Sequence, residues 1–151
     1  MKEKVNHMRK TQGFSLIEIL VVVVIIAVMV AIVAPQFLGE AEKARITRVK
    51  ADIQQIESAL DRFQLDNGFY PTMEQGLEAL VRKPDIEPEP KNYPPGGYLK
   101  RLPKDPWDNE YVYVYPGEHG VYDIYSLGAD GEEGGEGVNA DIGNWDEQDE
   151  R

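Results

Sequence analysis

A predominantly apolar run near the N-terminus, residues 14–34, dominates the hydrophobic pattern of this chain, and Glu18 is the only ionisable residue within it. About 20 such residues suffice for a helix to cross a bilayer core, so the run predicts a transmembrane helix over residues 14–35. A carboxylate buried in lipid costs about 2.5 kcal/mol or more, and intramembrane ionisable residues usually serve a function with a specific partner. Glu18 is therefore the first candidate functional residue, and its partner has to be identified.

The apolar pattern changes after Pro35, because proline kinks or ends a helix. Downstream, apolar residues recur at alternating intervals of three and four, as in one apolar stripe on a helix. These residues are Ile46, Val49, Ile53, Ile56, Leu60 and Phe63. The pattern favours a helix that continues, kinked, to Asp66, where Asn67 and Gly68 supply a stop. The stripe fits either a coiled-coil seam or the spine of a globular domain, and we expect the second because the stripe is short.

The remaining pattern predicts a small domain of mixed structure. Thr72 and Gln75 fit a capping box and predict a second, short amphipathic helix that ends near Arg82. The proline- and glycine-rich stretch that follows predicts a loop without periodic structure. Two β-branched and aromatic runs, residues 111–115 and 121–125, then predict an antiparallel hairpin. A helix packed on a small antiparallel sheet belongs to the fold class α+β.

Charge and composition exclude several classes of function. The chain of 151 residues has a formal net charge of -11 at pH 7, with acidic residues concentrated towards its C-terminal end. A nucleic-acid-binding protein would need a basic face, so no nucleic acid is expected as a partner. The absence of cysteine excludes disulfides, thiolate metal sites and cysteine nucleophiles. The two histidines, His7 and His119, lie far apart in the sequence, which argues against a histidine metal cluster or a catalytic triad.

An acidic, glycine-rich segment, residues 126–141, has too few apolar side chains to fold by burial. Ordering it costs about 1–2 kcal/mol per residue. Carboxylate and carbonyl oxygens of the kind that Ca²⁺ binds could offset that cost. Asp130 and Asp141 mark the two ends of a possible site, but Gly134 stands at its fifth position and a predicted strand precedes it, unlike an EF-hand. Composition alone leaves two alternatives open, a calcium site and a mobile acidic loop.

The leader, residues 1–13, is short, polar and basic and ends in Gly13. Its charge favours a cytoplasmic N-terminus. The sequence of basic leader, Gly13, Phe14, the apolar start and Glu18 resembles the type IV prepilin signal. The resemblance implies that a prepilin peptidase/N-methyltransferase cleaves after Gly13 and methylates the new N-terminus at Phe14. It also implies that Glu18 meets the N-terminal amine of a neighbouring subunit, and such a pair is far less costly in an apolar setting than an isolated charge.

Segments over nearly the whole chain resemble the major pseudopilin family of bacterial type II secretion. These segments are residues 70–72, 74–77, 102–107, 126–131 and 141–145. The resemblance implies a type IV pilin-like fold: a long N-terminal helix, transmembrane and then amphipathic, packed on a small antiparallel β-sheet with a C-terminal metal-binding loop.

The same resemblance implies one Ca²⁺ in that loop. The implied ligands are the Leu127 carbonyl, Asp130, Glu132, Gly135 and Asp141. Ala140 stands where some members carry a further aspartate, so it supplies no side-chain ligand. Many true type IV pilins close this loop with a disulfide, which a chain without cysteine cannot form, and this difference favours a pseudopilin.

The resemblance therefore implies a structural subunit without enzymatic activity. Its parts would be a cleaved leader (1–13), a transmembrane segment (14–35) and a periplasmic domain (36–151). It would reside in the bacterial inner membrane with a cytoplasmic N-terminus, and would polymerise into a periplasmic fibre that promotes export of folded proteins across the outer membrane. The implied partners are further copies of the chain, the prepilin peptidase, minor pseudopilins, the inner-membrane assembly platform with its ATPase, and the lipid bilayer.

Two alternative functions stay open at this point. The first is a true type IV or competence-type pilin subunit. The second is a membrane-anchored, calcium-dependent hydrolase, in which Asp105 and Asp108 would act as acid/base carboxylates. Their position beside Pro106 and Trp107 fits a turn better.

Overall fold

The computed structural model describes residues 13–146, so the predicted leader lies, apart from Gly13, outside the described residues. Contacts divide the chain into two compact units with a boundary between Glu40 and Ala41. The elements, in order, are α1 (Leu16–Asn67), η1 (Leu77–Leu80), β1 (Val112–Val114), β2 (Asp123–Ser126), η2 (Gly137–Asn139) and β3 (Ile142–Gly143). A long helix followed by a small antiparallel sheet confirms the predicted α+β class.

Helix α1 begins and ends within two residues of the predicted bounds and includes Pro35. The predicted continuation of the helix beyond this proline is therefore confirmed. At the C-terminal end, Gly68 has a φ of 82° and its N–H donates to the Gln64 carbonyl at 2.7 Å. A left-handed glycine in this position is a common way to end a helix.

In the first unit, residues Leu16–Val33 form the one described helical segment that is long and apolar enough to cross a membrane. The mean hydropathy of this segment is 3.4, and none of it is buried inside the protein. Apolar side chains without a protein covering fit a lipid environment.

In the second unit, the apolar stripe of α1 is the spine of the core. Val49, Ile53, Ile56, Leu60 and Phe63 are buried, with Ala59 between them, whereas Ile46 is half-buried. The stripe packs against buried residues of the loops and the sheet, among them Leu80, Tyr98, Tyr113 and Ile124. The prediction of a globular spine is confirmed, and the coiled-coil alternative is wrong for this part of the helix.

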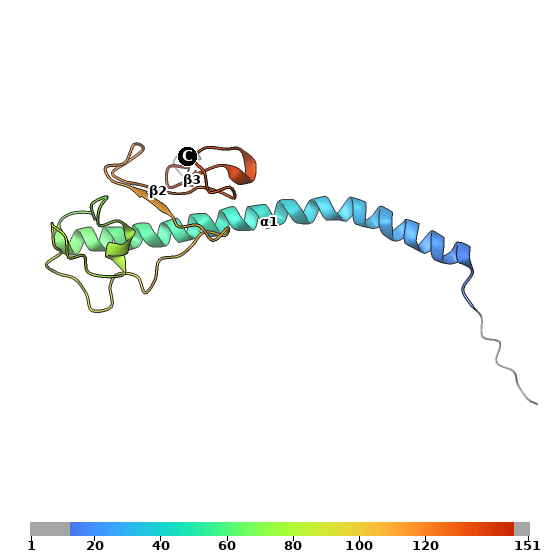
Figure 1. Ribbon diagram of the computed structural model, residues 1–151, viewed down its shortest axis with the longest axis horizontal. Helices are drawn as coiled ribbons and strands as arrows, with labels where there is room; N and C mark the ends of the chain where they lie inside the picture. The colour runs from blue at the N-terminus through green and yellow to red at the C-terminus, as the bar shows by residue number, and fades with distance from the viewer. Residues whose placement is uncertain (1–12, 147–151) are drawn as a thin grey trace, which may run out of the picture. The chain divides into compact units, whose positions relative to one another are not determined.

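The sheet is three-stranded and antiparallel, in the order β1-β2-β3. Strands β1 and β2 form the predicted hairpin, with Tyr113 opposite Ile124, although both strands are shorter than predicted. Strand β3 pairs with β2 through Ser126 and Ile142. Figure 1 shows β2 and β3 lying along one side of the C-terminal half of α1, where the ribbon is cyan to green.

The predicted second, short helix is present only as the 3₁₀ helix η1, which ends at Leu80, two residues before the predicted Arg82. The capping box is present, since the Gln75 N–H donates to Thr72 Oγ1 at 3.2 Å and the Thr72 N–H donates to Gln75 Oε1 at 3.1 Å. However, Gly76 has a φ of 58°, which is outside the right-handed helical region. The box therefore opens a turn, and only the short 3₁₀ helix η1 follows it.

Candidate functional site

The predicted processing and assembly residues lie together at the start of α1. Gly13, Phe14 and Ser15 precede the helix without regular structure, and Phe14 is exposed. A Cβ placed on Gly13 would meet no atom of residues 15–146 within 4 Å, and its φ is not in the left-handed region. The fold of the described residues therefore does not require glycine at this position.

Ser15 and Glu18 form a capping box that sequence reasoning missed. The Glu18 N–H donates to Ser15 Oγ at 3.3 Å, and the Ser15 N–H donates to Glu18 Oε2 at 3.4 Å. A serine followed three residues later by glutamate, just before an apolar run, is the sequence signature of this motif. Within a single copy of the chain, Glu18 is therefore both exposed and engaged in the cap of its own helix.

The second candidate site is the loop between β2 and β3, residues 127–141. Glu132, Gly135 and Asp130 are exposed, whereas Leu127 and Asp141 are half-buried. Asp130 Oδ1 accepts the Glu132 N–H at 3.2 Å. Among residues 13–146, the structure brings together no group of three or more histidine or acidic side chains that could hold a metal. A site here would depend on backbone carbonyls as well as carboxylates.

One oxygen of Asp141 has no partner among the described residues. Its Oδ2 accepts the Gly134 N–H at 2.9 Å, while its Oδ1 is buried without a hydrogen bond. A buried, unpaired carboxylate oxygen is unfavourable, and a hard cation such as Ca²⁺ binds oxygen ligands of this type. The residues present therefore fit a calcium ion at this end of the loop.

Glycine is required at two positions of the loop. A Cβ on Gly135 would lie 2.5 Å from the Asn139 carbonyl oxygen, and a Cβ on Gly128 would lie 2.8 Å from the same oxygen. Both residues also have positive φ, 84° and 69°. The loop thus folds back on itself at Asn139, just before Asp141.

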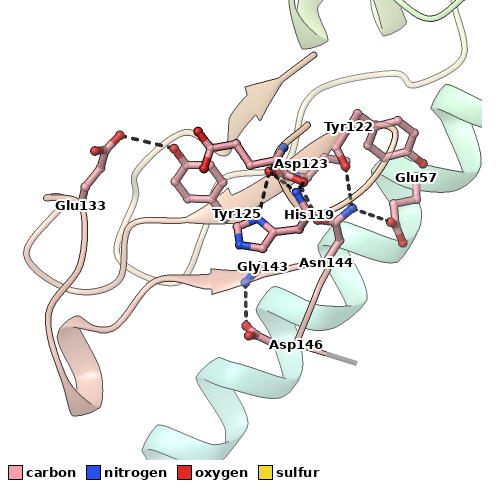
Figure 2. A network of polar contacts seen from close by, with 11 residues as sticks. Glu57, His119, Tyr122, Asp123, Tyr125, Glu133, Gly143, Asn144 and Asp146 are labelled. Carbon is pink, nitrogen blue, oxygen red and sulfur yellow. Dashed lines mark hydrogen bonds and ion pairs between the residues drawn. The ribbon is translucent and has the colours of Figure 1, made fainter. Parts of the chain in front are cut away.

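A network of polar contacts holds β3 against the hairpin and α1 (Figure 2). Asn144 Oδ1 accepts the Ile124 N–H at 3.2 Å, and its Nδ2 donates to Glu57 Oε1 at 3.1 Å and to the Tyr122 carbonyl at 3.2 Å. Sequence reasoning gave Asn144 no role, because its partners are distant along the chain. The network anchors the C-terminal end of the loop to the helix.

Asp123, buried in β2, holds the turn of the hairpin. It accepts the backbone N–H groups of Glu118 and His119 and contacts His119 Nδ1 at 3.0 Å (Figure 2). Burial alone would raise the pKa of Asp123, but the hydrogen bonds from Glu118 and His119 outweigh burial and lower it. Two residues further along β2, burial and then the charges of Glu133 and Asp141 raise the pKa of Tyr125, so this phenol stays neutral at physiological pH.

The lowered pKa of Asp123 predicts a pH-dependent contribution to stability. Because the folded-state pKa lies below the ordinary 3.8, the contribution is present above that value and is lost as the pH falls below it. We expect Asp123→Asn to reduce the free energy of unfolding by about 1–3 kcal/mol at pH 7, and the difference from wild type to shrink towards pH 2. Urea unfolding at both pH values measures this. The exposed Asp108→Asn variant is the control, and a pH-independent difference would contradict the assignment.

Asp105 and Asp108 do not form an acid/base pair. Asp105 Oδ1 accepts the N–H groups of Trp107 and Asn109 at 3.0 and 2.8 Å, as in a side-chain-capped turn. Asp108 is exposed and lies 3.4 Å from Lys104 Nζ. The predicted turn chemistry of this segment is confirmed.

Comparisons with known proteins agree over the length of the chain. The family model described as type II secretion system (T2SS), protein G matches residues 36–145, and the prokaryotic N-terminal methylation motif matches residues 8–34. The chain is 57% identical to a type II secretion system core protein G from Vibrio cholerae over 95% of this chain and 98% of that protein. A core protein G from Pseudomonas aeruginosa is 55% identical over 91% and 97% of the two chains.

A solved structure is also similar. The crystal structure of the major pseudopilin from the type 2 secretion system of enterohaemorrhagic Escherichia coli matches with a TM-score of 0.66 and 48% identity. The match covers 72% of this chain and 89% of that one.

Proposed function

Because this chain belongs to the type II secretion system protein G family and is a subunit of the type II secretion pseudopilus, we propose that cleavage after Gly13 prepares its N-terminal helix for polymerisation. The observation that carries this proposal is a pair of consecutive family matches. The methylation motif covers residues 8–34, and the protein G domain follows over residues 36–145. The alternatives of a true type IV pilin and of a hydrolase lose their support, since the domain match is to protein G.

Processing creates the partner of Glu18. Cleavage between Gly13 and Phe14 releases an α-amino group, which is a cation near neutral pH. We propose that Glu18 of one subunit pairs with the N-terminal amine of the next, which offsets both charges in an apolar fibre core. A buried pair of this kind also restricts the register between neighbouring helices.

Calcium is proposed to rigidify the C-terminal loop. The buried, unpartnered Oδ1 of Asp141 supports this proposal. Asp130, Asp141 and the Leu127 carbonyl would hold the ion, together with groups from Glu132 and Gly135. When bound, the ion would supply no reaction chemistry; it would keep the loop ordered so that domains pack side by side in the fibre.

The apolar segment Leu16–Val33 supports an inner-membrane subunit with a cytoplasmic N-terminus and a periplasmic domain. Its proposed partners are further copies, the prepilin peptidase/N-methyltransferase, minor pseudopilins, and the assembly platform with its ATPase. The fibre would promote export of folded proteins across the outer membrane, with energy from the ATPase.

Mass spectrometry of the chain purified from cells with a prepilin peptidase tests the processing step. We expect a mature protein that begins at N-methylated Phe14 and lacks residues 1–13. Gly13→Leu is expected to retain the leader while the periplasmic domain melts as in wild type, since a Cβ at this position would have no atom of residues 15–146 within 4 Å. A wild-type chain that keeps Met1 would refute the proposal.

A further inference from the structure

Asp105 lies outside the proposed calcium ligands but is joined to the entrance of the calcium loop. We propose that Asp105 is a positioning residue which, through Ser126, sets the orientation of the Leu127 carbonyl and thereby the affinity of the loop for Ca²⁺. This inference rests on the proposed calcium site and adds a residue from a different turn of the chain to it.

The contact between Asp105 and Ser126 is short and buried. Ser126, the last residue of β2, is 0% exposed, and Asp105 is 2% exposed. The Ser126 hydroxyl donates to Asp105 Oδ2 at 2.6 Å. Since Asp105 Oδ1 already accepts two backbone N–H groups, from Trp107 and Asn109, the carboxylate is fixed in place by its own turn. Asp105 therefore presents a fixed acceptor to Ser126.

Asp105 Oδ2 determines which hydrogen bonds the Ser126 hydroxyl can make. A hydroxyl has one hydrogen to donate and lone pairs to accept with. Because the hydrogen of Ser126 is directed to Asp105, a lone pair of Oγ is left for the Gly128 N–H, which donates to it at 3.2 Å. The serine thus transmits the position of Asp105 to the backbone of Gly128.

The Gly128 N–H and the Leu127 carbonyl belong to the same peptide unit. In a planar trans peptide these two groups point in opposite directions. Holding the N–H on Ser126 therefore holds the Leu127 carbonyl on the other side of the unit. A carbonyl fixed in one direction binds a cation without the entropy cost of ordering it during binding.

A second contact from the same turn steadies the next peptide. Asn109, whose N–H is held by Asp105, donates from its side-chain Nδ2 to the Gly128 carbonyl at 3.2 Å. Gly128 in turn lies against the backbone of Asn139 and Ala140, because a Cβ on it would be 2.8–2.9 Å from their atoms. The turn at Asp105 therefore supports both the outgoing chain at Leu127 and the returning chain before Asp141.

Asp105→Asn replaces one carboxylate oxygen, which accepts a hydrogen bond, with an NH₂ group, which donates one. If the amide oxygen keeps the two backbone N–H groups, its NH₂ faces Ser126, and the serine hydrogen loses its buried acceptor. The Gly128 N–H then competes for the serine oxygen. Residues that orient metal ligands typically change metal affinity 10–100-fold when mutated, so we expect calcium affinity to fall by about tenfold or more.

The test is a calcium titration of the full chain in detergent. Binding is monitored by the melting temperature and by calorimetry. Asp105→Asn and Ser126→Ala are each expected to raise the Kd for Ca²⁺ about tenfold. The double variant is expected to bind about as weakly as either single one, because both substitutions break the same connection. Asp108→Asn makes the same chemical change in the same turn without contact to Ser126 and should bind as wild type does. Ile53→Val removes a buried methyl from the core, so it should lower the melting temperature without changing the Kd.

The outcomes separate the two proposals. If wild type shows no response to Ca²⁺, the calcium site itself is wrong and the role of Asp105 falls with it. If wild type responds and Asp105→Asn has the same Kd, the positioning role is wrong while the calcium site stands. The positioning role would also be overturned if the double variant raised the Kd by the product of the two single-variant factors. Should Asp105→Asn fail to fold, the Kd of Ser126→Ala decides alone.

Discussion

Replacing Glu18 with alanine is expected to leave the subunit in the membrane and to abolish fibre assembly. The apolar run gains hydrophobicity without the carboxylate, so insertion does not suffer. In the fibre, however, the N-terminal amine would be buried without its partner, and breaking a buried pair in this way costs about 3–5 kcal/mol. Electron microscopy of sheared fibres and a secretion assay in a strain that lacks the native subunit measure the loss.

Two matched variants separate the intersubunit pair from the capping box. Ser15→Ala removes the cap of α1, which is worth about 1 kcal/mol, but keeps the carboxylate, so fibres should still form. Glu18→Gln keeps a side chain that fits the capping box but removes the charge, so fibres should be lost. Normal fibres from Glu18→Gln would contradict the charge pair, and loss of fibres from Ser15→Ala would assign the role of Glu18 to its own helix.

Removal of calcium is expected to lower the melting temperature of the periplasmic domain by about 10 °C. At a concentration one hundred times the Kd, a bound ion stabilises the folded state by about 2.7 kcal/mol. In a domain of roughly 100 residues, 1 kcal/mol corresponds to about 4 °C or more. Asp130→Ala and Asp141→Ala should melt near the temperature of the chelated wild type and should no longer respond to chelator. Differential scanning calorimetry with and without chelator checks this.

Glu136→Ala provides the control for loop charge. Its side chain is exposed and is not a proposed ligand, although it lies in the same acidic loop. This variant should retain the full response to calcium. Wild-type melting that chelator leaves unchanged would refute the calcium proposal, and a response lost equally in Glu136→Ala would indicate general charge repulsion in place of a defined site.

The long helix could be predicted from the sequence because its signals are local and repeated. An apolar run of the right length and an apolar stripe at helical spacing both extend over many residues, and Gly68 marks the end with a left-handed turn. The hairpin was predictable for the same reason, from two β-branched and aromatic runs that pair through Tyr113 and Ile124.

Other elements depend on single residues or on distant contacts. The predicted second helix is reduced to a short 3₁₀ helix because Gly76 adopts a φ outside the helical region, and an amphipathic pattern does not reveal this. Strand β3 has only two residues, one of them Gly143, so it carries no strand signal of its own. It pairs because Asn144 bonds to Ile124 and Glu57, which lie 20 and 87 residues away.

The functional sites also divide into those with a local sequence signature and those that depend on distant contacts. The capping box of Ser15 and Glu18 has a local signature and could have been found in the sequence. The contact between Asp105 and Ser126 spans 21 residues and joins a turn to the end of a strand, so only the folded chain reveals it. The calcium ligands that the resemblance implies stay a prediction, supported by the unpartnered Oδ1 of Asp141.

The central claim is that cleavage at Gly13 creates the partner of Glu18 in the fibre. A cryo-electron microscopy map of fibres assembled from the wild-type chain tests it most directly. We predict density for Glu18 of one subunit within ion-pair distance, about 4 Å or less, of the methylated Phe14 nitrogen of a neighbouring subunit. A Glu18 carboxylate that contacts only Ser15 of its own helix, or a fibre whose subunits retain residues 1–13, would contradict the claim.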